Sequence, residues 1–406
     1  LGTRSGPGAD SSRVAAVFSG VKRMEYLIPE GIFDGQALRT GKALVVEDGI
    51  VTNLCDTQVL PEGSSLRHDA AVYGPPLFDV QVNGGGGVML NSQPTRDGVR
   101  RVAEAHNQAG TGFLLPTVIT DRPEVTEKAA LAVAAELGRN GVSGIHIEGP
   151  HISLQHKGTH NPELIRPFDA RTLTLLEQLR ARKIPVLLTL APECVPPGLI
   201  AGLTKMGVRV SAGHSAASAE ITKRALDEGL CCFTHLFNGM PPMTSRHPMI
   251  TGAAINSEAW CGIIADGHHV DAQMLQLAIR ARPVANRMIL VSDAMSTIGG
   301  PDSFELYGET IHVSGGRLVN AAGSFAGAHI DLKSAVAFVI EKSGVQPAEA
   351  LKMAGGNAFA MMGLEAPDFV GQPLRALTRL EIKSTCKQRH GECPAEVPGD
   401  QRPQNG

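Results

Sequence analysis

Three side chains that can bind a metal ion stand at the ends of three short apolar runs in this 406-residue sequence. Glu148 ends the run SGIHIE, His214 follows VRVSA, and His235 lies near the end of CCFTHL. One carboxylate and two imidazoles form an oxygen and nitrogen ligand set that suits Zn²⁺ or Fe²⁺ and leaves one position open for water. A lone histidine at such a place is usually an ordinary buried side chain, but the three together predict a site for one divalent metal ion.

A fourth ionisable residue, Asp293, follows the apolar run ILV-Ser. A carboxylate beside a metal-activated water can take its proton, although an Asp that caps the next helix is the alternative interpretation. Gln81 and Asn83 occupy the place where many barrel hydrolases carry a His-x-His pair for a second metal, and neutral amides are poor ligands. We therefore predict one metal, with Gln81, Asn83 and His146 lying around its ligands.

The elements that must position these residues are eight apolar runs separated by amphipathic segments. Such runs are typical of parallel strands that helices bury on both faces, and eight of them predict a (β/α)₈ barrel with its reactive residues at the carboxyl ends of the strands. An open, doubly wound sheet is the alternative. The predicted strands are 77–82, 112–118, 143–148, 185–191, 208–212, 231–236, 261–266 and 287–293.

The segments on either side of the barrel have a different pattern. Residues 24–75 predict a small β domain, with a hairpin signal at EDGI, and 76–363 the barrel, which also contains a hairpin at ETIHVSGGRLV and two helices within 331–363. Residues 1–23 are expected to be a disordered or artefactual leader. Residues 364–406 form an atypical tail, polar and rich in proline, without obvious strands.

Composition excludes several classes of partner. The net charge is −3 and aromatic residues make up 4% of the chain, which argues against nucleic acid as a ligand. No apolar stretch is long enough to span a membrane. The seven cysteines include no CxxC pair, which is typical of reduced thiols in a cytoplasmic protein.

Seven motifs between residues 78 and 362 closely resemble the N-acetylglucosamine-6-phosphate deacetylase family of the amidohydrolase superfamily. They read FDVQVNGGGG, GIHIEGPHISLQHKGTHNPELI, LTLAPE, VSAGHSAA, THLFNGMPPMTSRHPMITGAAI, CGIIADGHHVD and LVSDAMSTIGG. The resemblance implies a (β/α)₈ barrel with a small β-sandwich built from the flanking N- and C-terminal segments. It also implies a homodimer and the conversion of N-acetylglucosamine-6-phosphate to glucosamine-6-phosphate and acetate.

The resemblance also assigns roles to individual residues. Glu148, His214 and His235 match the family's metal ligands, Asp293 its acid and base, and His269 the histidine that contacts the sugar and polarises the acetyl carbonyl. In this scheme Asp293 deprotonates a metal-activated water and then protonates the leaving amine, while a neutral His269 donates a hydrogen bond to the carbonyl oxygen. The substrate contacts that the resemblance implies are Thr159, His160, Asn238, Gly239, Arg246, His269, Phe325, Ala326 and Gly327.

Two other functions remain open at this stage. The barrel could hydrolyse another amide, such as a cyclic ureide or an N-acetyl amino acid, although a neutral substrate would not need the phosphate clamp predicted at Arg246. A non-catalytic sugar-phosphate-binding protein is the second alternative, and it predicts the loss of Asp293 or of a metal ligand, all of which are present.

Overall fold

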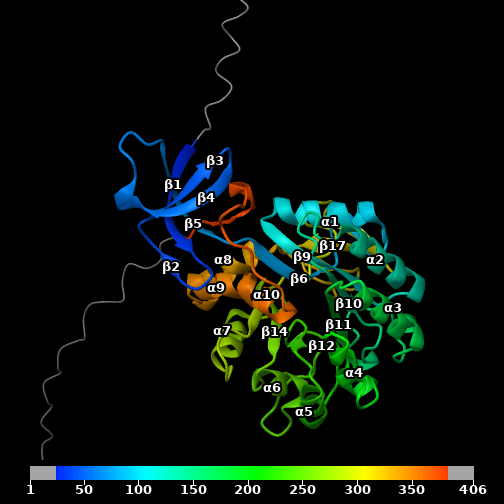
Figure 1. Ribbon diagram of the computed structural model, residues 1–406. Helices are drawn as coiled ribbons and strands as arrows, with labels where there is room; N and C mark the ends of the chain where they lie inside the picture. Colours follow the sequence, from blue (N-terminus) through cyan, green and yellow to red (C-terminus); the bar gives the residue numbers. More distant parts are fainter. Residues whose placement is uncertain (1–23, 383–406) are drawn as a thin grey trace, which may run out of the picture.

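A sheet of eight parallel strands forms the centre of the molecule (Figure 1), and the computed structural model describes residues 24–382. The sheet order is β15-β14-β13-β12-β11-β10-β9-β6, and a β-bridge between Val82 and Ala294 joins its two ends. Each predicted apolar run coincides with one strand, which confirms the (β/α)₈ barrel. The strands are β6 (Leu77–Val82), β9 (Thr111–Ile119), β10 (Ile145–Glu148), β11 (Val186–Leu190), β12 (Arg209–Ala212), β13 (Cys232–Phe233), β14 (Trp260–Ile264) and β15 (Met288–Val291).

Helices surround this sheet and cover its outer face. Several begin at a side chain that accepts a hydrogen bond from a backbone N–H of the first turn, as Thr95, Asp169 and Ser218 do. Residues 331–363 hold three helices where the sequence predicted two, because the irregular backbone of Gly355 separates α9 from α10. The helices are α1 (Arg96–Gln108), α2 (Pro123–Glu136), α3 (Ala170–Ala181), α4 (Leu199–Lys205), α5 (Ala219–Asp227), α6 (Met249–Ile255), α7 (Ala272–Arg280), α8 (Leu332–Ser343), α9 (Pro347–Ala354) and α10 (Gly356–Met362).

A second sheet stands beside the barrel and is built from segments on both sides of it in the chain. Its order is β19-β5-β1-β3-β4, with β2 paired to β1. The tail, for which we expected no strand, contributes β19, which pairs antiparallel with β5 from Thr378 opposite Gly74. The predicted leader 1–23 and the tail beyond residue 382 lie outside the described residues. The strands are β1 (Met24–Phe33), β2 (Leu38–Arg39), β3 (Lys42–Glu47), β4 (Ile50–Asp56), β5 (Leu66–Gly74) and β19 (Thr378–Leu380).

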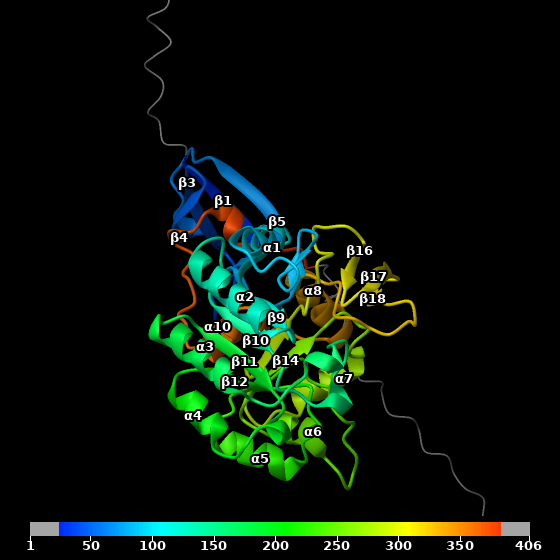
Figure 2. The ribbon, with the colours of Figure 1, turned by 90° about the vertical axis from the view of Figure 1, so that its right-hand side faces the viewer.

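A small antiparallel sheet lies next to the carboxyl-end loops of the barrel (Figure 2). It consists of β16 (Ser303–Leu306), β17 (Glu309–Ser314) and β18 (Arg317–Val319), and it includes the predicted hairpin. Its apolar residues Leu306, Ile311 and Leu318 pack with Ile119 and Met295 of the barrel. The strand pair β7 (Gly84–Gly85) and β8 (Val88–Met89) follows the first barrel strand.

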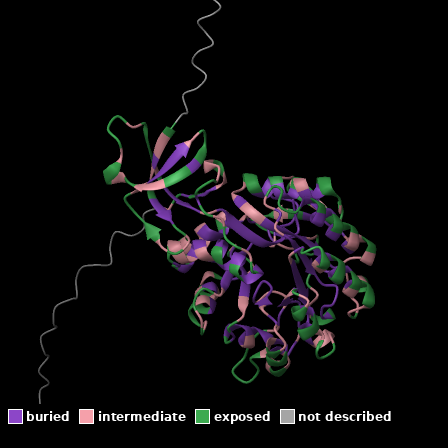
Figure 3. Cartoon of the chain, viewed as in Figure 1, coloured by how far each residue is buried: buried purple, intermediate pink, exposed green. Residues whose placement is uncertain are grey.

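Buried residues concentrate in the barrel strands and on the inner faces of the helices (Figure 3). Phe78 is fully buried at the start of the first barrel strand, where its ring lies 4.6 Å from that of Phe359 and 6.4 Å from that of Phe113. Apolar burial of this kind is the main favourable contribution to folding. Within residues 24–382, no helix has both the length and the apolar character needed to cross a membrane.

Candidate active site

The predicted metal ligands and Asp293 converge at the carboxyl ends of four barrel strands. Glu148 is the last residue of β10, whereas His214, His235 and Asp293 each stand two residues beyond the end of β12, β13 and β15. These three have backbone φ angles of +47°, +29° and +51°. Residues with a Cβ rarely adopt such angles, and strained backbone of this kind gathers at functional sites.

Three atoms that can bind a cation lie within hydrogen-bond distance of one another in this cluster. Glu148 Oε1 lies 3.2 Å from Nε2 of His214 and 3.0 Å from Nε2 of His235, and the two nitrogens are 3.1 Å apart. His214 uses its other nitrogen, Nδ1, to donate to the carbonyl oxygen of His156 at 2.8 Å. A neutral His214 therefore points the lone pair of Nε2 at the other two atoms.

This arrangement fits a divalent metal ion. A single proton on Nε2 of His235 can form a hydrogen bond to only part of the cluster. A cation can instead interact with the lone pairs of all three ligand atoms. Ligand atoms at about 2.0–2.1 Å from a tetrahedral metal lie about 3.3 Å from one another, close to the observed separations. His160 is a further candidate, since Glu148, His160 and His214 offer ligand atoms that all lie within 4.8 Å of one another. The Nδ1 of His160 is already 2.6 Å from the hydroxyl of Thr120.

Two neutral amides hold the carboxylates of the site in place. Asn83 Nδ2 and Gln81 Nε2 donate to Oδ1 of Asp293 at 2.7 and 3.0 Å, and Gln81 Nε2 also lies 3.2 and 3.1 Å from the two oxygens of Glu148. Within residues 24–382, Oδ2 of Asp293 accepts no hydrogen bond. One carboxylate oxygen of Asp293 is thus fixed while the other can exchange a proton.

The two carboxyl groups differ in their tendency to ionise. Burial disfavours the charged form of Glu148, but the adjacent imidazoles of His214 and His235 hold its pKa well below the usual value. Burial and the nearby charge of Glu148 raise the pKa of Asp293. Carboxyl groups with opposite pKa shifts at one site are typical of a pair with different roles, here one ligand and one proton carrier.

His146, predicted to lie near the ligands, points into a buried layer of hydroxyl groups. Its Nε2 is 2.8 Å from Oγ1 of Thr189 and its Nδ1 is 3.2 Å from Oγ1 of Thr117. Burial lowers the pKa of His146 to about 4, so the ring is neutral near pH 7. It makes no hydrogen bond to the three clustered ligands within the described chain.

A cavity of about 160 Å³ opens directly over the cluster. Ala326 is buried, and neither it nor Arg246, on the exposed segment between α5 and α6, is among the residues that line the cavity. Most of the predicted substrate contacts do line it. The predicted residues along the cavity are Asn83, Glu148, Thr159, His160, His214, His235, Asn238, Gly239, His269, Asp293, Phe325 and Gly327.

An aspartate to which sequence reasoning gave no role fixes the tautomer of His269. The Nδ1 of His269 donates to Oδ2 of Asp266 at 2.6 Å, while Oδ1 accepts the backbone N–H groups of His268 and His269 at 2.8 Å each. Burial opposes ionisation, but these donors lower the pKa of Asp266 to about 2. The signal that could have revealed it is the Asp-x-x-His spacing directly after a barrel strand.

This contact bears on the prediction that a neutral His269 donates a hydrogen bond to the acetyl carbonyl oxygen. With the proton of a neutral ring on Nδ1, its Nε2 is an acceptor and has no hydrogen to offer to a carbonyl oxygen. With Nδ1 donating to Asp266, the ring can donate from Nε2 only if both of its nitrogens carry a proton. The ring of Phe325 lies 5.1 Å from that of His269 and helps to fix its orientation.

The sequence is similar to curated enzymes that deacetylate amino-sugar phosphates. The chain is 40% identical over 321 residues to N-acetylgalactosamine-6-phosphate deacetylase of a Shewanella species, covering 77% of this chain and 80% of that protein. It is 32% identical over 296 residues to N-acetylglucosamine-6-phosphate deacetylase of Haemophilus influenzae, covering 71% and 76%.

A solved structure supports the same relationship. N-acetylglucosamine-6-phosphate deacetylase from Pasteurella multocida matches with a TM-score of 0.78 at 29% identity, over 86% of this chain and 94% of that one. A scan against models of protein families finds no match.

Proposed function

The chain belongs to the family of N-acetylglucosamine- and N-acetylgalactosamine-6-phosphate deacetylases, and from this membership we propose that it removes acetate from N-acetylglucosamine-6-phosphate, yielding glucosamine-6-phosphate. The observation that carries the proposal is the set of three ligand atoms of Glu148, His214 and His235, 3.0 to 3.2 Å apart, beside Asp293 in one cavity. Hydrolysis of an unactivated amide near neutral pH needs both an activated water and a proton for the leaving nitrogen.

Glu148, His214 and His235 would hold one divalent cation, Zn²⁺ or Fe²⁺, which would supply Lewis acidity to the water and to the acetyl carbonyl. Asp293 takes the proton of the attacking water on its Oδ2, since its Oδ1 is held by the two amides. The same carboxyl then returns this proton to the nitrogen of the leaving amine. His269, as an imidazolium, donates from Nε2 to the oxygen on which negative charge develops.

The remaining residues along the cavity would bind and orient the sugar. Thr159, His160 and Asn238 offer polar groups to the hydroxyls, and the left-handed backbone of Gly239 leaves room that a side chain would fill, since a Cβ there would lie 2.8 Å from Nδ1 of His214. Phe325 offers an apolar face next to His269.

Arg246 remains the proposed phosphate contact, with one added requirement. It lies on an exposed segment, and it does not line the cavity of its own chain. An anion contact therefore needs either a movement of this segment or an Arg246 supplied by a second copy of the chain. We propose the second of these, in keeping with the homodimer expected from the family resemblance. Light scattering of the wild-type protein tests this requirement, because a monomeric mass would exclude an Arg246 supplied by a second copy.

N-acetylgalactosamine-6-phosphate is the second candidate substrate. The specific observation in its favour is the 40% identity to a deacetylase of that sugar phosphate, against 32% for a deacetylase of the glucosamine compound. The two sugars differ only in the configuration at carbon 4. The proposed reaction and cation site are the same for both substrates.

An acetate-release assay tests the proposal. We expect a kcat/KM for a phosphorylated sugar at least about 100-fold above that for unphosphorylated N-acetylglucosamine, because a phosphate bound by charged groups adds several kcal/mol. The ratio between the two phosphorylated epimers identifies the preferred substrate. Equal turnover of N-acetylglucosamine and its 6-phosphate would contradict the proposed substrate class.

We also propose a cytoplasmic location. Its support is that the five cysteines of the described chain, Cys55, Cys194, Cys231, Cys232 and Cys261, are free thiols, as expected in a reducing compartment.

A further inference from the structure

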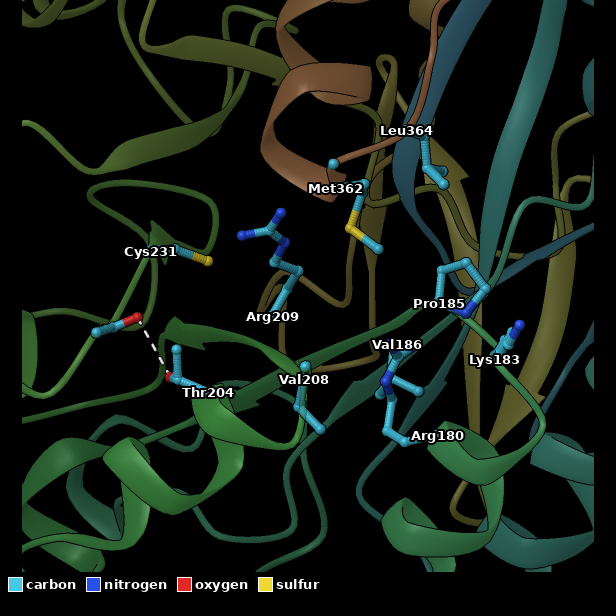
Figure 4. A pocket seen from close by; sticks show the side chains of 13 residues that line it. Arg180, Lys183, Pro185, Val186, Thr204, Val208, Arg209, Cys231, Met362 and Leu364 are labelled. Atoms are coloured by element: carbon cyan, nitrogen blue, oxygen red, sulfur yellow. Dashed lines mark hydrogen bonds between the residues drawn. The ribbon is translucent and has the colours of Figure 1, made fainter.

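A second cavity, of about 410 Å³, is shown in Figure 4. It lies at the opposite end of the barrel strands from the candidate active site. Residues at or just before the starts of β11, β12 and β13 line it, together with the ends of α3 and α10. Arg209 begins β12, and the other end of this strand leads to His214. We call this cavity the basal pocket and define it by Arg180, Lys183, Val186, Arg209, Cys231 and Met362.

The basal pocket is positively charged. Arg180, Lys183 and Arg209 line it, and no carboxylate does. Within residues 24–382, none of the three forms an ion pair, although ion pairs occur elsewhere on the surface. Arg180 donates from Nη1 to the carbonyl oxygen of Ile184 at 2.5 Å and from Nε to that of Met206 at 3.5 Å, whereas the guanidinium of Arg209 has no hydrogen-bond partner among the described residues.

Two glycines make room for the guanidinium groups. Gly207 and Gly363 have φ angles of +87° and +68°, and a Cβ would lie 2.9 Å from Nη2 of Arg180 at the first and 2.4 Å from Nη2 of Arg209 at the second. Arg180 and Arg209 are half-buried against these glycines. Figure 4 shows Arg209 between Cys231 and Met362. Half-buried guanidinium groups without a carboxylate partner are well suited to bind an anion.

We propose that the basal pocket binds a small phosphate monoester, separately from the active site. Guanidinium groups donate two parallel hydrogen bonds to phosphate oxygens, and a lysine adds a point charge. Apolar side chains such as Val186 and Met362 would contact the carbon skeleton of the ester. The volume falls within the roughly 300–1,000 Å³ of small-molecule sites. The proposal goes beyond the deacetylase reaction and does not depend on it.

Titration calorimetry with inorganic phosphate tests the proposal. The pocket variant carries Lys183→Gln and Arg209→Gln, and the control carries Lys128→Gln and Arg280→Gln, two exposed cations of α2 and α7 with the same total charge. We expect the pocket variant to bind phosphate at least about tenfold more weakly at the basal pocket, because it lacks two of the three cationic donors. The control should match the wild type, and both variants retain the active site. Equal binding by wild type, pocket variant and control would overturn the proposal.

A second measurement uses the wild-type chain and reports on the pocket directly. Cys231 lines the basal pocket, whereas Cys194 is half-buried elsewhere. Phosphate should slow the alkylation of Cys231 by iodoacetamide at least about threefold without slowing that of Cys194, as expected when a ligand occupies most of the pocket. Glucosamine-6-phosphate should protect more strongly than inorganic phosphate if a sugar ester is the ligand, and unphosphorylated glucosamine should not protect. Alkylation of Cys231 at the same rate with and without either phosphate would refute the proposal.

Discussion

The substitution Asp266→Asn tests the proposed charge on His269. It keeps the shape of the side chain and an oxygen for the backbone N–H groups of His268 and His269, but it removes the carboxylate that faces Nδ1 at 2.6 Å. An amide N–H in that place leaves Nδ1 as the acceptor, so His269 keeps its proton on Nε2 and stays neutral. The variant should therefore bind substrate normally but stabilise the developing oxyanion less well.

The magnitude follows from the shift at Asp266. Its pKa falls from 3.8 to about 2, which corresponds to about 2 kcal/mol at roughly 1.4 kcal/mol per unit. Burial acts against this shift, so the hydrogen bonds and the charge of His269 provide at least that much. Losing this stabilisation of the cationic ring should lower kcat about 30-fold at pH 7, with KM changed less than about threefold.

The same shift sets a pH dependence of stability. A carboxyl group whose folded pKa is below its unfolded pKa stabilises the folded state above the unfolded value, and the benefit disappears as the pH falls through the folded value. In urea denaturation, the wild type should therefore exceed Asp266→Asn by about 2 kcal/mol from pH 8 to pH 5. The difference should shrink as the pH falls from about 4 towards about 2.

A matched control lies on the same loop. Asp271 caps α7 through the backbone N–H of Gln273, and asparagine caps helices about as well as aspartate. Asp271→Asn should keep both kcat and stability close to the wild-type values. If Asp266→Asn keeps kcat within twofold of the wild type at pH 7 while its fold is intact, His269 does not act as an imidazolium.

Four further predictions concern the cluster and the core. Dialysis against a chelator should abolish acetate release and lower the melting temperature, and Zn²⁺ or Fe²⁺ should restore both; undiminished activity of metal-free protein would rule out the cation. Asp293→Asn should lower kcat by about 10² to 10⁴ in the same assay, with substrate binding by calorimetry nearly unchanged. Gln81→Leu, which removes the donor to Glu148 and Asp293, should weaken metal binding about 10- to 100-fold in a competition titration with a chromogenic chelator. Phe78→Ala should cost about 3–5 kcal/mol in urea denaturation, and a loss below 1 kcal/mol would contradict its place in a rigid core.

The positions of the barrel strands could be predicted from the sequence because each strand is buried on both faces and reads as a short apolar run. Strands 77–82 and 287–293 thereby place Gln81 and Asp293 at one end of the barrel. Their contact could not be predicted in detail. The 3.0 Å hydrogen bond joins residues 212 positions apart and depends on closure of the barrel between Val82 and Ala294.

Loops and the flanking segment were harder to predict. The family resemblance indicated a phosphate contact at Arg246, but a motif says nothing about the course of an exposed loop, and Arg246 does not line its own cavity. β19 has only three residues, too few for a periodic pattern, and its partner β5 lies some 300 positions earlier in the chain. Such a strand forms through backbone hydrogen bonds to an existing edge, which its side chains alone do not reveal.

The strained residues of the active site connect these observations. His214, His235 and Asp293 each stand two residues beyond a strand and have left-handed backbone, while Glu148 belongs to the strand itself. The positive φ angle occurs at the same distance from the end of each of these three strands. It changes the direction of the chain at the residue whose side chain has to face the barrel axis. Each such residue costs of order 1 kcal/mol or more, so the three oppose folding by a few kcal/mol in total. The packed barrel and the hydrogen bonds at His214 Nδ1 and Asp293 Oδ1 must therefore stabilise these backbone conformations. The donors to Asp293 are the neutral amides of Gln81 and Asn83, which suits a site with one cation.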